Sequence, residues 1–528
     1  MMPQKPWLIM VYQGGDNSLT EEMVLALQDL LAEGPPQDDK IVAQLDPWGD
    51  GLVTQRYDFT DAPNRGSHLG SYLVPQAGLV NTGSAASLTD FISWAVTLYP
   101  GDLNYLLILS GHGSGITENF LLSDDSSLDS LTIHELFNAL ESLSLPNGKA
   151  KIDILGFDAC YMSMGEIAYE LRNRVNFMVG AEGLEPEFGW PYRRLLAKAK
   201  AALGHLPPQG LAALIVDEYV DHYSNYDSSA GRSVDLAALD LSRMDVVAQK
   251  VKALTAEFCL LSKQDHERLL LAHWHAQTYK SDQYVDLKDF CEMVKEQFTA
   301  TAIRTACDGV IDALTGGGVG QRAILRSGCS GYACQHSWGF SLYFPWCVIV
   351  PEYQNPNPAP AGVQRPPFAT VAGWYDFLRQ HIDLTRRPAR AADAISNSNY
   401  ELGSTALATL AARACDRLEA LQRRRLRGFA PGLLPAAAQP IKTKCHEAAD
   451  VVKTFLRATG DIPDADFEME TARRVLRGSR LDSGNGRYTA RSRYTARSRY
   501  TARSRYLDDR ETWIKNLSPV IGTAYFKK

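Results

Sequence analysis

A histidine and a cysteine, each directly after a run of apolar residues, are the side chains with the clearest chemical potential. His112 lies in a glycine-rich turn after the mostly apolar residues 105–110, and Cys160 follows the mostly apolar residues 152–157. Parallel strands of one sheet end at the same edge, so we expect His112 and Cys160 to lie close together. A thiol beside an imidazole supports nucleophilic catalysis. Cys160 would attack a carbonyl carbon, and His112 would protonate the leaving group and later activate water.

Backbone groups near these two residues are expected to assist. A helix is predicted over residues 162–173, and its N-terminus would lower the pKa of the Cys160 thiol and supply N–H donors. The N–H groups of Gly113 and Cys160 are candidates for stabilising an oxyanion. A single cysteine after a strand is more often a small buried side chain, and a single histidine is often a turn residue. The pair, 48 positions apart with a helix between, is more specific.

Strand-like and helix-like stretches alternate through the first part of the chain. Strands are predicted at residues 7–12, 41–46, 52–59, 105–110, 152–157 and 175–181, and helices at 20–32, 87–98, 132–143 and 162–173. Thr132 and Glu135 form the pattern of a capping box. This alternation predicts a mostly parallel sheet covered by helices on both faces. Further on, the pattern predicts mainly helix over 190–315, a strand at 337–345, a loop over 351–367 and a helix at 371–382.

Composition narrows the class of protein. The chain has 528 residues, of which 45% are hydrophobic and 22% charged, as in ordinary globular proteins. No apolar run is long enough to span a membrane, and no signal-peptide apolar core precedes Trp7. Nine scattered cysteines without a CxxC pair argue against a disulfide framework or a structural zinc site. We therefore expect a cytoplasmic protein without membrane contact.

Charge is distributed unevenly along the chain. Residues 386–528 carry 28 Lys and Arg against 15 Asp and Glu, a net +13, so the whole-chain charge of −7 leaves −20 for residues 1–385. We expect a catalytic domain over 1–385, a basic and mainly helical extension over 386–480, and a flexible tail over 481–528. The tail contains the repeat Arg-Tyr-Thr-Ala-Arg-Ser three times from Arg487. It is open to three interpretations: a solvated stretch, a docking or nucleic-acid-binding segment, or a protease-sensitive segment.

The histidine turn followed by Asp-Ala-Cys after the next strand resembles the clostripain family of cysteine peptidases. Similar segments are residues 7–19, 181–192, 233–240, 284–290 and 339–345. The resemblance implies a caspase-like fold, a three-layer α/β/α sandwich with a mostly parallel central sheet. It also implies a cysteine endopeptidase whose substrate is a protein or peptide. Asp16 and Asn17, after the first strand, are expected to support the loops near the site.

The resemblance also bears on specificity and on metals. Family members typically cleave after Arg or Lys, and Asp158 matches one acid of their first specificity pocket. Phe188 takes the place of the second acid, with Glu187 beside it, so either Glu187 substitutes or the pocket is more apolar. The family leaves calcium open as a cofactor, with Asp124, Asp125 and Asp129 as a weak candidate cluster, since EF-hand spacing is absent. We otherwise expect no metal, because His273 and His275 do not share a helix face.

Activation and alternatives follow from the same residues. Residues 113–148 contain no Lys or Arg, so self-cleavage between His112 and Cys160 is not expected for an enzyme that cuts after basic residues. The basic tail is a candidate for docking on the acidic domain. Alternatives are a catalytically silent caspase-like scaffold and a protein that responds to nucleic acid through its tail. The resemblance also permits a role in bacterial defence by cleavage of a pore-forming partner.

Overall fold

The structure is a computed structural model. It describes residues 5–49, 52–62, 66–74, 80–117, 121–202, 204–224, 233–280, 283–346, 348–354 and 365–385. The predicted basic extension (386–480) and the repeat tail (481–528) lie outside the described residues. Tail docking and nucleic-acid binding therefore stay predictions.

Nine strands of the described part form one sheet in the order β13-β10-β9-β8-β5-β1-β2-β3-β4. Their bounds are β1 (Trp7–Gly15), β2 (Lys40–Pro47), β3 (Gln55–Asp58), β4 (Leu73–Val74), β5 (Asn104–Ser110), β8 (Ile152–Asp158), β9 (Val175–Gly180), β10 (Val234–Asp240) and β13 (Ile324–Ser330). The five central strands, from β9 to β2, pair in parallel, and both edges add antiparallel strands. The carboxyl ends of the central strands therefore share one edge.

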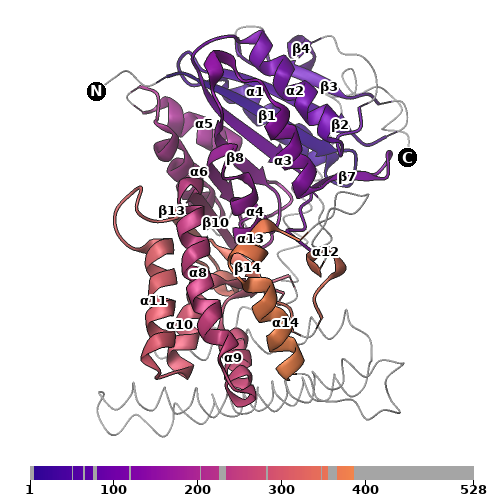
Figure 1. Cartoon of the computed structure of the whole chain (residues 1–528). Helices are drawn as coiled ribbons and strands as arrows, with labels where there is room; N and C mark the ends of the chain where they lie inside the picture. Colours follow the sequence, from indigo (N-terminus) through magenta and orange to yellow (C-terminus); the bar gives the residue numbers. More distant parts are fainter. Residues whose placement is uncertain are drawn as a thin grey trace, which may run out of the picture.

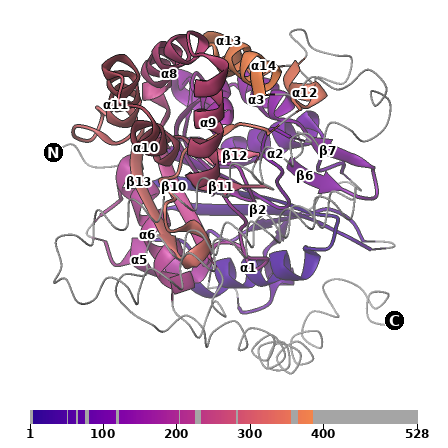
Figure 2. The same cartoon turned by 90° about the horizontal axis from the view of Figure 1, so that it is seen from below.

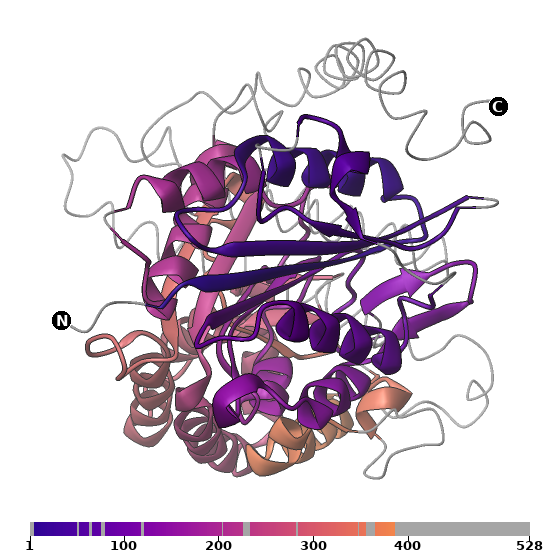
Figure 3. The same cartoon turned by 90° about the horizontal axis from the view of Figure 1, so that it is seen from above.

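Alternation of side chains along the central strands divides the core in two. Leu8, Met10 and Tyr12 of β1 belong to one buried cluster, and Ile9 and Val11 belong to the other. This period of two is what a strand buried on both faces requires. Helices α1 (Thr20–Glu33), α5 (Tyr192–Lys200) and α6 (Pro208–Ser224) cover one face, and α2 (Ala85–Leu98), α3 (Ile133–Ser142) and α4 (Gly165–Leu171) cover the other. Figure 3 shows the sheet between these two helical layers.

A second group of helices continues the core of the α2–α4 face, in the lower half of Figure 1. It comprises α8 (Met244–Cys259), α9 (Lys263–His275), α10 (Leu287–Gln297), α11 (Thr301–Thr315), α12 (Pro351–Gln354), α13 (Pro367–Val371) and α14 (Trp374–Thr385). Two small sheets complete the described chain: β11 (Thr278–Tyr279), β12 (Tyr284–Asp286) and β14 (Ser341–Tyr343) in one, and the hairpin β6 (Leu121–Asp124) and β7 (Asp129–Leu131) in the other. Figure 2 shows both from below.

Most predicted elements are present. The capping box is confirmed, because Thr132 Oγ1 accepts from the Glu135 N–H and the Glu135 carboxylate accepts from the Thr132 N–H. The prediction of mainly helix over 190–315 is confirmed, but it missed β10, a fully buried strand beside β9. Its Leu and Ala residues favour helix locally, and burial between β9 and β13 overrides that preference. Among the described helices, none is both long and apolar enough to cross a membrane.

Candidate active site

The strands that carry the histidine and the cysteine are parallel neighbours, as their apolar runs predict. Ser110, the last residue of β5, is the register partner of Asp158, the last residue of β8. Ser110 Oγ donates to Asp158 Oδ2 at 3.0 Å, and the Gly111 N–H donates to the Asp158 carbonyl at 3.1 Å. His112 and Cys160 each lie two residues beyond this pair, so the two turns leave the sheet side by side.

The turns meet at Gly113. A Cβ atom placed on Gly113 would lie 2.6 Å from the Cys160 carbonyl oxygen and 3.3 Å from the Cys160 nitrogen. Only glycine allows this approach. In the bridge between Gly113 and Leu121, the hydrogen bond runs from the Leu122 N–H to the His112 carbonyl at 2.9 Å. That bond does not use the Gly113 N–H, so this group stays a candidate oxyanion donor.

The His112 imidazole is partly exposed and has a defined partner. Its Nε2 atom lies 3.1 Å from Ser18 Oγ, at the turn between β1 and α1. Burial lowers the pKa of His112, and the carboxylates of Asp125 and Glu187 partly oppose this shift. His112 is therefore neutral at neutral pH. Sequence reasoning did not single out Ser18, although Gly15, Asp16 and Asn17 before it were recognised as a strand end.

Cys160 is half-buried in a turn, and no helix begins at it. The expected lowering of its thiol pKa is wrong: α4 begins five residues later, at Gly165, and burial raises the pKa. The Glu185 N–H, which donates to Sγ at 3.3 Å, opposes that shift. Tyr161 adopts a φ of 64°, an unusual angle for a non-glycine residue, and so redirects the chain just after Cys160. The resting pair is thus a neutral thiol and a neutral imidazole.

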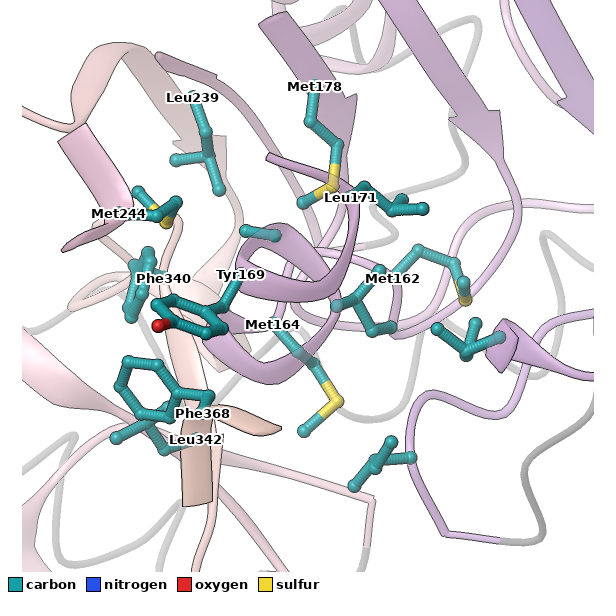
Figure 4. Close-up of a cluster of buried hydrophobic side chains, with 14 of the residues drawn as sticks. Met162, Met164, Tyr169, Leu171, Met178, Leu239, Met244, Phe340, Leu342 and Phe368 are labelled. Atoms are coloured by element: carbon teal, nitrogen blue, oxygen red, sulfur yellow. The ribbon is translucent and has the colours of Figure 1, made fainter. Parts of the chain in front are cut away.

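The segment after Cys160 is anchored in the hydrophobic core. Met162 and Met164 are fully buried, and they join the cluster drawn around α4 in Figure 4. Phe340 and Phe368 reach this cluster from distant parts of the chain. A cysteine whose following residues are this deeply packed has little freedom to move, so its sulfur is held in place before a substrate arrives.

Asp158 is buried directly behind the cysteine turn. Its Oδ2 accepts from Tyr192 Oη at 2.8 Å, in addition to Ser110. Burial raises the pKa of Asp158, and the hydrogen bonds from Tyr192 and Ser110 oppose that rise. A Cβ atom on Gly189 would lie 2.7 Å from Asp158 Oδ1, and φ at Gly189 is 64°. Gly189 therefore leaves open the space next to the carboxylate.

The acid that lies against Asp158 is Glu185. Burial, and then the charge of Asp158, raise the pKa of Glu185 well above its usual range. Both Glu185 carboxyl oxygens are buried, and neither makes a well-formed hydrogen bond to a described residue. Neighbouring carboxyl groups disfavour each other's charge, which adds to the effect of burial on Glu185.

The two residues expected to complete this pocket are both exposed. Glu187 is exposed, and its charge acts on His112. The Phe188 side chain is 49% exposed. Exposure does not exclude a side chain from an open substrate pocket, so the expected role of Glu187 or Phe188 stays a prediction. The Gly189 N–H bonds to the Pro186 carbonyl and closes a turn over residues 186–189, which spacing from the cysteine cannot reveal.

Two further buried acids hold the loop that carries Glu185. Asp235 accepts from the N–H groups of Glu182 and Gly183 at 2.7 and 3.0 Å. Glu182 Oε2 accepts from the Gly339 N–H at 2.8 Å. The Gly183 carbonyl in turn accepts from the Tyr161 N–H at 2.9 Å, next to the cysteine. Segments 181–192 and 233–240 were recognised in the sequence. The only sign there that Asp235 holds the loop is that a carboxylate lies within an apolar stretch.

Calcium can be tested against the described acids. Asp16, Asp46 and Asp124 each offer a carboxylate oxygen within 4.8 Å of the others, and all three are buried. Asp16 Oδ1 is a buried atom without a hydrogen bond to a described residue. Burial first, with the charges of Asp124 and Asp16 adding to it, raises the pKa of Asp46 to about 6. Oxygen donors of this kind suit calcium. The expected cluster changes membership, because Asp125 and Asp129 are exposed.

His273 and His275, which were not expected to bind a metal, both lie in α9. His273 is buried, with its ring stacked on Phe344 and Trp346 at centroid distances of 4.2 and 4.0 Å. Its ring therefore packs between aromatic side chains.

A mostly parallel α/β sheet between two helical layers, with His112 and Cys160 after adjacent strand ends, agrees with the caspase-like fold that the sequence predicts. Residues 71–333, which include both His112 and Cys160, match the model of the Clostripain family, peptidase family C11. The chain belongs to this family of cysteine peptidases.

Individual relatives are more distant. Clostripain of Hathewaya histolytica is 26% identical over 207 residues, or 31% of this chain and 39% of that protein. The chain thus matches less than half the length of this curated relative. A secreted C11 cysteine protease from Bacteroides thetaiotaomicron, solved with an irreversible peptide inhibitor, is 18% identical over 70% of this chain and 99% of that one, with a TM-score of 0.49. An inactive zymogen C11 protease from Parabacteroides distasonis is 18% identical over 73% and 99%, with a TM-score of 0.46.

Proposed function

We propose that this chain is a cysteine endopeptidase in which Cys160 is the nucleophile and His112 the acid and base. The observation that carries the proposal is the contact of Gly113 with the Cys160 backbone, which joins the two turns at one edge of the sheet. Family membership supports the same chemistry. A peptide carbonyl placed over this contact has a sulfur on one side and two backbone donors on the other.

The raised pKa of the thiol and the lowered pKa of the imidazole define how the proton moves. The Cys160 proton passes to His112 as the sulfur bonds to the carbonyl carbon. The N–H groups of Gly113 and Cys160 hold the oxyanion. His112 then gives its proton to the leaving amine as the C–N bond breaks. His112 then takes a proton from a water molecule as its oxygen bonds to the thioester carbon. As the C–S bond breaks, His112 returns this proton to the sulfur.

For the substrate, we propose a peptide with Arg or Lys before the scissile bond. Both carboxyl oxygens of Glu185 are buried without a hydrogen-bond partner among the described residues, and Gly189 leaves open the space beside the Asp158 carboxylate. A guanidinium supplies several N–H donors in a fixed planar arrangement. It also carries a positive charge, which pairs with the carboxylate groups. A bound cationic side chain favours the charged form of both acids. An apolar residue at that position would leave the Glu185 oxygens without a donor.

We also propose that the enzyme works without cleavage between His112 and Cys160. Lys149 and Lys151 are the nearest basic residues before Cys160, and they flank the amino end of β8. Lys149 Nζ bonds to Asp153, and Lys151 Nζ donates to the Arg172 carbonyl at 2.7 Å. A strand of this length places them roughly 20 Å from the cysteine of the same molecule. Calcium, where bound, would be held by Asp16, Asp46 and Asp124 and would neutralise their charge.

A peptide library that varies the residue before the scissile bond tests the proposal directly. Wild type is expected to release product after Arg and Lys, while Cys160→Ala and His112→Ala lose turnover at unchanged thermal stability. Equal cleavage by Cys160→Ala would overturn the proposed nucleophile and favour the silent scaffold. Turnover that depends on Cys160 but prefers apolar residues would overturn the role given to Asp158 and Glu185.

A further inference from the structure

The hydrogen bond between Ser18 and His112 joins the first strand of the sheet to the candidate acid and base. Ser18 Oγ lies 3.1 Å from His112 Nε2. We propose that Ser18 is a positioning residue that holds His112 in the tautomer with its proton on Nε2, leaving Nδ1 for proton transfer. This inference rests on the proposed peptidase function, because it assigns the nitrogen that would exchange the proton of Cys160.

Buried hydrogen bonds fix the backbone around Ser18. Asn17 is buried, and its Nδ2 donates to the Gly14 and Ser123 carbonyls at 2.9 and 2.8 Å. Its Oδ1 accepts from the Leu19 N–H at 3.0 Å. The turn is thus closed on both sides of Ser18 and tied to the β6–β7 hairpin. A serine held in this way loses little further conformational entropy when its hydroxyl meets the imidazole.

The His112 backbone is fixed independently. Its carbonyl accepts from the Leu122 N–H at 2.9 Å, and the preceding Gly111 N–H bonds to the Asp158 carbonyl at 3.1 Å. Ser18 and His112 therefore belong to two separately anchored turns, and their side chains meet between them. Two preorganised partners give a hydrogen bond that sets the ring orientation.

A hydroxyl suits this task in a particular way. When Nε2–H donates to Ser18 Oγ, the lone pair of the neutral ring is on Nδ1, where a base is needed. A carboxylate in the place of Ser18 would stabilise the imidazolium and raise its pKa. The charged groups that act on the ring are the carboxylates of Asp125 and Glu187. Ser18 therefore orients the ring without adding a charge, and the imidazolium stays acidic enough to protonate a leaving amine.

The test compares Ser18→Ala with Ser18→Thr, which keeps a hydroxyl, and with Ser127→Ala, an exposed serine of the neighbouring β6–β7 turn. Ser18→Ala is expected to lower kcat about 3- to 10-fold with KM within twofold, the loss of one net hydrogen bond. Ser18→Thr is expected to recover most of this loss, and Ser127→Ala to equal wild type. A kcat for Ser18→Ala within twofold of wild type would overturn the proposal.

Nitrogen NMR of ¹⁵N-histidine-labelled protein reads the tautomer without any turnover. His112→Gln identifies the His112 signals, and wild type at pH 8 is expected to show the proton on Nε2. Ser18→Ala is expected to shift the signals toward a mixture of tautomers. An unchanged tautomer in Ser18→Ala, with or without a fall in thermal stability, would assign Ser18 a structural role only and overturn the proposal. Absence of peptidase activity in wild type would overturn the proposed function instead, and the NMR result would still stand.

Discussion

Ser110 and Asp158 end adjacent parallel strands in register, and the hydroxyl of one donates to the carboxylate of the other at 3.0 Å. This pair sets the common origin from which the His112 and Cys160 turns depart. It also places the buried charge of Asp158 beneath the cysteine turn. A single point in the sheet therefore positions the proposed dyad and the acid that would bind the substrate side chain.

Removing the Tyr192 hydroxyl tests whether substrate binding depends on the hydrogen bonds that hold Asp158. Tyr192→Phe removes one of the two hydroxyl donors to Asp158, which accepts from Tyr192 at 2.8 Å. We expect kcat/KM for an Arg substrate to fall about 3- to 10-fold and unfolding to become easier by about 1–2 kcal/mol, the cost of a buried acceptor that loses a partner. Steady-state kinetics measures the change in kcat/KM, and thermal denaturation measures the change in stability. Tyr223→Phe, which removes a hydroxyl that donates to the Gly189 carbonyl, is the matched comparison.

Gly113→Ala tests the contact between the two turns. Its methyl group would lie 2.6 Å from the Cys160 carbonyl oxygen, so the turns must separate and the oxyanion donors move apart. We expect kcat to fall about 100-fold or more, as when an oxyanion donor is lost. Gly318→Ala is the control, because a Cβ atom there meets nothing within 4 Å. Near-normal kcat in Gly113→Ala would contradict the placement of the oxyanion at this contact.

Glu185→Gln separates the proposed pocket role of Glu185 from its cost to stability. We expect kcat/KM for Arg substrates to fall about 10-fold or more, since a charge-assisted hydrogen bond is lost. Glu187→Gln, an exposed acid two residues on, is the matched control and is expected to keep the preference for Arg over Leu. Equal losses in the two variants would remove Glu185 from the pocket.

The same variant carries a pH prediction for stability. The folded-state pKa of Glu185 is raised above its ordinary value of 4.5, so the folded protein holds the proton more tightly than the unfolded chain. The stability contributed by this proton is present at low pH and is lost as pH rises from 4.5 through the raised pKa. Glutamine does not ionise, so Glu185→Gln is expected to have a higher Tm than wild type at pH 8, with little difference at pH 4.

His112 sets the acid limb of the pH profile. Its pKa is lowered from 6.5 by burial, so kcat/KM is expected to rise with a midpoint below pH 6.5 as the imidazole loses its proton. Asp125→Asn removes a carboxylate that stabilises the imidazolium, and the midpoint is expected to move to lower pH. Asp129→Asn, on the same hairpin, is expected to leave it unchanged. A shift of the midpoint to higher pH in Asp125→Asn would contradict this assignment.

The local sequence determined the two strand ends and their chemistry. Continuous apolar runs before His112 and Cys160 specify buried strands, because only a sheet covered on both faces accommodates them. The capping box at Thr132 and Glu135 is equally local, since its partners are three residues apart. The order of histidine and cysteine, and the glycine between the turns, were therefore readable before any coordinates.

Only the tertiary structure decided which side chains complete the site. Ser18 meets His112, and the charge of Asp158 acts on Glu185, because hydrogen bonds between residues distant in the sequence hold these loops. The same holds for the raised pKa of the Cys160 thiol, which depends on burial and not on the neighbouring sequence. Strand positions follow from periodicity along the chain. The directions of loop side chains follow from contacts between residues more than 50 positions apart, which periodicity does not encode.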